Sequence, residues 1–243
     1  MGCRAMFTDR AAVFAALRAR LERHGGASTD RDRGAVPVVE VVDDELPDGG
    51  LARGAVHEVA PARGEADTGA AFAFSALLAG RAGDTTIWIE PTPSLWPAGA
   101  VAFGLDPAAL VLVAARGTDS LWAAEEALRC PAVGTCVLVG IVPDLTASRR
   151  LQLAAEAGGG LGIMVVPEPH LATASAARTR WRISSIPGTG TWDHDLADPC
   201  WRLELVAGRG CRPGQWELRW DAMARRLLPH GALENPIRIA AGG

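Results

Sequence analysis

Short apolar runs alternate with longer segments of mixed polarity through the middle of the chain. The runs are typical of buried strands, and the mixed segments are typical of amphipathic helices. We expect strands at residues 36–42, 55–60, 85–90, 110–114, 135–142 and 161–166, and helices at 69–81, 119–129 and 146–157. Strands that alternate with helices of this length form parallel sheets covered by helices on both faces. The pattern therefore predicts an α/β fold with a mostly parallel sheet.

The last third of the chain follows a different pattern. Residues 179–183, 201–205 and 216–220 alternate between apolar and polar positions, and a turn rich in glycine and proline spans 207–214. A period of two indicates antiparallel strands with one face in water, so the sheet should end in an antiparallel C-terminal edge hairpin. Five of the eight tryptophans fall here and should fill the core side of these strands: Trp181, Trp192, Trp201, Trp216 and Trp220.

Residues 7–23 carry apolar side chains at helical spacing. Phe14, Leu17 and Leu21 fall on one face, arginines lie mainly on the other, and two glycines follow the segment. The pattern predicts an amphipathic helix, which either packs on its own domain or docks on a neighbouring subunit or partner. In the second case, Phe14, Leu17 and Leu21 are candidate partner-binding residues.

One sizeable domain should account for most of the 243 residues. An N-terminal helix and linker (1–32) precede the core (33–225), and a tail with prolines and terminal glycines (226–243) should be loosely ordered. Hydrophobic residues make up 49% of the chain and charged residues 21%, which is ordinary for a protein with a real core. The apolar runs are too short to cross a membrane as a helix, so we expect no membrane association.

The net charge and the cysteine content limit which partners, and which cellular compartment, we expect for this chain. A formal net charge of −4 provides no overall attraction to a nucleic acid. The five cysteines are scattered, without a Cys-x-x-Cys pair or a Cys/His set at metal-ligand spacing. We therefore expect no disulfide framework and no metal site, as in a reduced, cytoplasmic protein. The histidines are also scattered, and none is expected to be catalytic.

Residues 64–71 (GEADTGAA) keep the two glycines of a phosphate-binding loop, Gly64 and Gly69. In the pattern G-x-x-x-x-G-K-[ST], lysine neutralises phosphate oxygens and Ser or Thr holds Mg²⁺. Ala70 and Ala71 stand at those positions, and no lysine occurs elsewhere, because every basic residue is arginine. The loop is therefore degenerate, and we expect no nucleotide cofactor and no phosphoryl-transfer chemistry.

Several segments resemble known families. Residues 49–59 (GGLARGAVHEV) and 87–90 (IWIE) are similar to RecA-type recombinases. More narrowly, the runs 121–131 (LWAAEEALRCP) and 145–156 (LTASRRLQLAAE) resemble the ImuA family, the RecA-related accessory proteins of a bacterial damage-inducible mutagenesis cassette. The resemblance covers roughly residues 40–221 and implies a RecA-like core.

The same resemblance implies that further recombinase positions are lost. The glutamate that activates water in RecA proteins corresponds to Thr92, and the metal-binding aspartate that follows a central strand corresponds to Gly140. Glu90 and Asp144 lie near the vacated positions, but without a lysine to bind phosphates we do not expect them to restore activity. Such groups act as a set, so their coincident loss predicts a protein that is not an enzyme.

The ImuA resemblance also implies partners. It indicates a cytoplasmic assembly for damage-induced translesion DNA synthesis with ImuB, an inactive relative of Y-family polymerases, with an error-prone polymerase α subunit, and with RecA. Self-association through the docking edges of a RecA-like domain is also expected. The stretches at the recombinase DNA loops, 141–146 and 167–177, are short and nearly free of positive charge, so direct DNA binding should be weak. The alternative functions are an ATP-dependent recombinase or motor and a SulA-like inhibitor of cell division.

Three further side chains are candidate partner contacts. Arg149 and Arg150 begin a helix, where positive charge is unfavourable, so they either lie in solvent, pair with Asp144, or bind a partner or phosphate. Trp96 lies in a proline-rich loop, and it either pins that loop or anchors an interface.

Arg178, Arg180 and Arg182 share one face of an expected strand. Cross-strand ion pairs with Glu204 or Glu217 would explain them. A basic ladder that faces DNA is the alternative.

Overall fold

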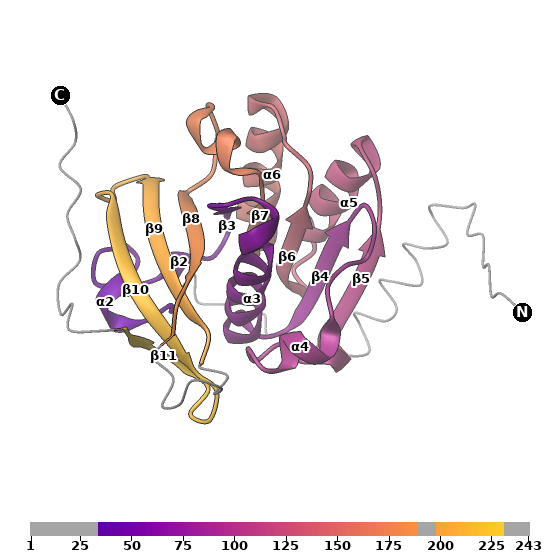
Figure 1. The fold of residues 1–243 in the computed structure, drawn as a ribbon. Coiled ribbons are helices and arrows are strands. Elements are labelled where there is room, and N and C mark those ends of the chain that lie inside the picture. The colour runs from indigo at the N-terminus through magenta and orange to yellow at the C-terminus, as the bar shows by residue number, and fades with distance from the viewer. Residues whose placement is uncertain (1–33, 189–197, 231–243) are drawn as a thin grey trace, which may run out of the picture.

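The computed structural model describes residues 34–188 and 198–230. Figure 1 shows a central sheet with helices on both sides. A separate two-stranded sheet pairs β1 (Ala35–Val36) with β2 (Leu51–Ala52). The expected N-terminal helix, with Phe14, Leu17 and Leu21, lies outside the described residues.

Within the described ranges the central sheet has nine strands, in the order β11-β10-β9-β8-β3-β7-β6-β4-β5. Strands β3 to β8 pair in parallel, whereas β8, β9, β10 and β11 form an antiparallel series. The predicted mostly parallel sheet with an antiparallel C-terminal edge is therefore confirmed. The strands are β3 (Ala55–Pro61), β4 (Thr85–Glu90), β5 (Leu110–Ala114), β6 (Val133–Val139), β7 (Leu161–Val165), β8 (Thr179–Ile186), β9 (Cys200–Gly208), β10 (Gly214–Asp221) and β11 (Arg226–Pro229).

Helices cover both faces of the parallel part of the sheet, as Figure 1 shows. One face packs against α3 (Glu65–Ala82), and the other packs against α5 (Thr118–Arg129) and α6 (Leu145–Gly158). Successive residues of a strand point to opposite faces, so Trp88 of β4 lies in the α3 layer while Ile87 lies in the α5–α6 layer. Four shorter helical segments are α2 (Glu40–Asp43), α4 (Pro97–Val101), η1 (Pro107–Ala109) and η2 (Glu168–Ala172).

Four of the five expected tryptophans fill the core beneath the antiparallel strands: Trp181, Trp201, Trp216 and Trp220. Trp192 lies outside the described residues. Trp181 is fully buried and packs against Phe74 of α3, with ring centroids 6.4 Å apart. Phe103 lies 5.6 Å from the ring of Trp201 and 5.5 Å from that of Trp220. These aromatic contacts join the antiparallel edge to the α3 layer.

Two expected elements differ in the structure. The strand expected at 36–42 ends at Val36, because Pro37 has no N–H to donate to a ladder. The following residues form α2, where the Asp43 carboxylate accepts from the Val38 N–H at 2.8 Å. At the other end, the tail expected from residue 226 begins with β11, which pairs with β10 because Leu227 is buried in the core.

Candidate functional site

The degenerate phosphate loop follows the carboxyl end of β3, where a nucleotide binds in an open α/β sheet. Instead of looping around a ligand, the chain turns once at Gly64, with φ 57° and ψ −128°, and α3 begins at Glu65. The expected helix start near Gly69 was therefore too late. Thr68, directly before the expected start, already lies in the helix, where its hydroxyl donates to the Gly64 carbonyl at 3.3 Å. Residues that would cradle phosphates are thus wound into the first helical turn.

A buried carboxylate occupies this helix start. Asp67 accepts hydrogen bonds from the Arg63 backbone N–H at 2.9 Å, from the Arg63 guanidinium at 2.7 and 2.9 Å, and from the Ser185 N–H at 2.8 Å. The Arg63 side-chain hydrogen bond, aided by the backbone donors, lowers the pKa of Asp67 to about 2. A helix N-terminus normally attracts anions, but here a fixed negative charge already lies in its first turn. We call these three residues the Asp67 clamp.

The two alanines at the Lys and Ser/Thr positions belong to the hydrophobic core. Ala70 is 5% exposed and Ala71 is fully buried in the α3 layer. Longer polar side chains at these positions would therefore meet packed apolar atoms rather than a ligand space.

Neither of the two acids near the vacated positions, Glu90 and Asp144, takes over a missing role in the described part of the chain. Thr92 lies exposed beyond β4, where its hydroxyl accepts from Arg116 at 3.2 Å, and Gly140 follows β6 with φ +75°. Glu90 is buried, and its two oxygens accept from the Ser94 N–H at 2.8 Å and hydroxyl at 2.7 Å. Asp144 caps α6 by accepting from the Ala147 N–H at 2.7 Å. Both neighbouring acids therefore serve local structure.

The segment after β7, at the position of the second recombinase DNA loop, is held by a buried ion pair. Arg180 of β8 donates from Nε to Glu58 of β3 at 2.6 Å, and from its other nitrogens to the carbonyls of residues 170, 171 and 173. The Ser175 hydroxyl also donates to Glu58, at 2.5 Å. This network ties the segment to the sheet and leaves Arg180 no charge to offer a nucleic acid.

Cross-strand pairing therefore explains only part of the arginine ladder. Arg182 pairs with Glu204 at 2.7 Å, as expected, and Arg178 pairs instead with Asp48 at 2.9 Å. Sequence reasoning missed the Arg180 pairing with β3. The signal available was Glu58 itself, since a carboxylate inside an apolar strand needs a buried partner.

Comparison with known proteins decides the family. Protein ImuA from two strains of Caulobacter vibrioides is 38% identical over 194 residues, which covers 73% of this chain and 80% of the relative. The chain belongs to the ImuA family. No protein-family model matches it. The RadB recombinase crystal structure aligns with a TM-score of 0.55 at 13% identity, over 77% of this chain and 96% of RadB, so the fold is RecA-like.

Among the predicted partner contacts of this ImuA-family chain, the side chain of Trp96 lies mostly in solvent. Trp96 directly precedes α4 and is 74% exposed. A Cβ built on Gly99 would lie 3.1 Å from the Trp96 ring, so the ring rests against the first turn of α4 with most of its surface in solvent. Trp96 is therefore mostly exposed, and its role as an interface anchor stays a prediction.

The two arginines of α6 differ from each other. Arg150 forms an ion pair with Glu125 of α5, which also pairs with Arg129, and not with Asp144. Arg149 is exposed at the same end of the helix. Both arginines are exposed, and among the described residues only Arg150 of the two forms an ion pair.

The described residues contain no group of three or more His, Cys, Asp or Glu side chains that could hold a metal ion. Within residues 34–188 and 198–230, none of the helices has the length and apolar character needed to cross a bilayer.

Proposed function

We propose that this ImuA-family chain is a non-catalytic, RecA-like accessory protein of damage-induced translesion synthesis. The Asp67 clamp is the observation that carries the proposal. The first turn of α3 follows directly on Gly64 and holds the buried Asp67 carboxylate, so the helix start lacks a phosphate-sized loop and carries a negative charge that repels an anion. The loss of lysine and of both carboxylate positions points the same way, because these groups act together in phosphoryl transfer.

The proposed role is to dock proteins rather than to turn over nucleotide. Family membership favours an ImuB-like relative of Y-family polymerases as the direct partner, RecA as another, and an error-prone polymerase α subunit as a member of the same cytoplasmic assembly. Self-association through the edges of the RecA-like sheet belongs to the same proposal. Direct binding of DNA should be weak, because the net charge is −4 and Arg180 and Arg182 are engaged in ion pairs.

Nucleotide titration is the first test. With the full chain and MgATP, isothermal calorimetry should detect no binding below about 1 mM, and phosphate release should equal the no-protein background. Sub-millimolar binding with turnover would overturn the proposal and favour a motor. Pull-down against an ImuB-like protein and the cell-division protein FtsZ separates the accessory role from a SulA-like one.

Restoring the loop residues should not restore activity. The double variant Ala70→Lys/Ala71→Thr should hydrolyse no ATP and should lose about 1–3 kcal/mol of unfolding free energy, because both sites are packed. Urea denaturation with a phosphate-release assay measures both. Ala66→Lys, at an exposed position of the same helix, is the control and should leave stability within about 0.5 kcal/mol. Hydrolysis by the double variant would show that a catalytic set survives.

Trp96→Ala should weaken partner binding without affecting the fold. An exposed tryptophan that anchors an interface contributes about 2 kcal/mol or more, which corresponds to roughly a thirtyfold loss of affinity for the ImuB-like partner. Met223→Ala, at a 97% exposed position, is the matched control and should bind as the wild type does. Surface plasmon resonance measures both affinities, and equal affinities for the two variants would exclude Trp96 as an anchor.

A further inference from the structure

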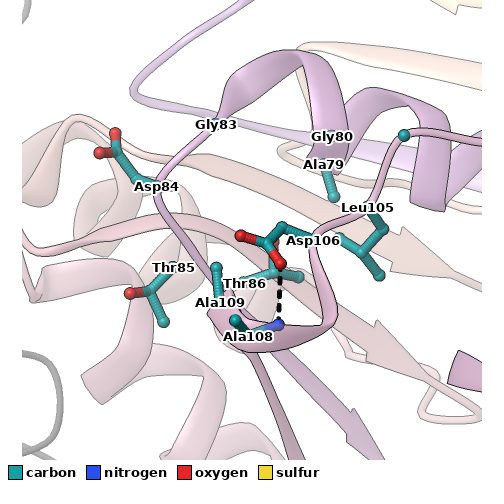
Figure 2. Close-up of a pocket in the computed structure, with 11 residues that line it drawn as sticks. Ala79, Gly80, Gly83, Asp84, Thr85, Thr86, Leu105, Asp106, Ala108 and Ala109 are labelled. Carbon is teal, nitrogen blue, oxygen red and sulfur yellow. Dashed lines mark hydrogen bonds between the residues drawn. The ribbon is translucent and has the colours of Figure 1, made fainter. Parts of the chain in front are cut away.

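A pocket of about 350 Å³ opens at the amino-terminal edge of the parallel sheet (Figure 2). Its lining comes from the last turn of α3, the start of β4 and the segment from Gly104 to Ala109. The degenerate phosphate loop lies at the other end of α3, and a helix of 18 residues is about 27 Å long. The pocket is therefore a separate site from the one inherited from the recombinases.

A close backbone contact builds one wall of this pocket. A Cβ on Gly80 would lie 2.5 Å from the carbonyl carbon and oxygen of Gly104, so only glycine lets α3 approach that segment so closely. Gly104 itself has φ +96°, a conformation that favours glycine. The wall is thus formed by ordered main chain.

The two charged residues that line the pocket, Asp84 and Asp106, are both acidic. The C-terminus of α3 carries the negative end of the helix dipole. The Asp106 carboxylate faces the pocket, and one of its oxygens accepts from the Ala108 N–H at 2.9 Å, drawn as a dashed line in Figure 2. Asp84 stands on the rim with its carboxylate pointing away, so it contributes charge rather than contact. No arginine is among the residues that line the pocket.

The side chain of Thr86 offers a hydroxyl group inside the pocket. Thr86 is 1% exposed and lines the pocket from the same face of β4 as Trp88, the face that α3 covers. Its hydroxyl forms no hydrogen bond with the described residues, and its oxygen is not among their fully buried unpaired atoms, so it stays open to the pocket. A ligand in the pocket can therefore reach this hydroxyl, which can donate or accept a hydrogen bond.

We propose that this pocket binds the guanidinium group of an arginine from a protein partner. A guanidinium offers five N–H donors in one plane, which suits acceptors spread over a carboxylate, a hydroxyl and helix carbonyls. The chain already places one guanidinium at this helix end, since Arg53 Nη2 donates to the Ala82 carbonyl at 2.5 Å.

The test uses two probes of the same shape. Acetyl-arginine methylamide carries the cation, and acetyl-citrulline methylamide replaces it by a neutral urea. In ¹H–¹⁵N spectra of the full chain, the arginine probe should shift the amides of Gly83, Asp84 and Leu105 saturably, with a Kd on the order of 1–10 mM. Citrulline should bind at least about tenfold more weakly, because charge-assisted hydrogen bonds are the stronger ones. Equal shifts from both probes would overturn the proposal.

Variants locate the interaction. Asp106→Asn keeps an oxygen for the Ala108 N–H, so the fold should hold, and the arginine probe should bind about tenfold more weakly. Thr86→Val removes the buried hydroxyl and should weaken binding severalfold. Asp44→Asn, an exposed acid outside the pocket, should leave binding unchanged. An Asp106→Asn protein that binds the probe as tightly as the Asp44→Asn control would refute the assignment.

Discussion

Replacing Arg180 by methionine should lower the free energy of unfolding by about 3–5 kcal/mol, because it leaves the Glu58 carboxylate buried without its charged partner. Three main-chain carbonyls of the segment after β7 lose their donors at the same time. Methionine retains much of the aliphatic volume, so the effect reports on charge and hydrogen bonding rather than on a cavity. Urea denaturation followed by tryptophan fluorescence measures the loss.

Arg182→Met is the matched control for this experiment. Arg182 lies two residues away on the same strand, but its ion pairs with Glu168 and Glu204 are 30% exposed on the arginine side. Such pairs contribute about 0–1 kcal/mol. Adding Glu58→Gln to Arg180→Met should recover part of the loss, since the uncompensated charge is removed. A loss for Arg180→Met no larger than for Arg182→Met would contradict the buried-pair account.

The same variant should loosen the segment that follows β7. Amides of residues 168–177 should exchange with deuterium faster in Arg180→Met, while those of β6 should change only as far as global stability falls. This readout separates the role of Arg180 in holding the segment from its contribution to the whole domain.

Acidification should destabilise the chain by about 3 kcal/mol between pH 6.5 and pH 4, because of His57. His57 is fully buried in β3 and accepts from the Thr179 hydroxyl at Nδ1, at 2.7 Å. Its Nε2 lies 2.9 Å from the Ala52 carbonyl, which requires the proton on Nε2. Burial of the charged form lowers the pKa of His57 to about 4.

The sign follows from proton linkage. The unfolded chain has a His57 pKa near 6.5 and binds the proton first, so the stability from this group is complete above pH 6.5 and declines as pH falls towards 4. His57→Gln keeps an N–H donor for the Ala52 carbonyl and does not titrate. Its stability should depend less on pH over this interval, as measured by urea denaturation at several pH values. Identical pH slopes for the variant and the wild type would rule out His57 as the cause.

The periodicity of apolar residues predicted most of the strands, because this pattern can be read from residues that are close together in the sequence. The strands expected at 85–90 and 110–114 match the structure residue for residue, since buried strands need continuous apolar runs. The RecA-like core was expected on different grounds, from the resemblance of residues 121–131 and 145–156 to the ImuA family. The strand expected at 36–42 was wrong because a single proline outweighed five valines nearby.

Residue identity alone also established what the phosphate loop lacks. A chain without lysine cannot supply the ammonium group of that loop in any conformation. Tertiary structure decided what took its place. The Asp67 clamp joins Arg63 and Asp67 to Ser185, which is 118 residues further along the chain, and Glu58 meets Arg180 across 122 residues. Such contacts depend on strand order and register, so local pattern predicted neither of them, nor the pocket at the opposite edge of the sheet.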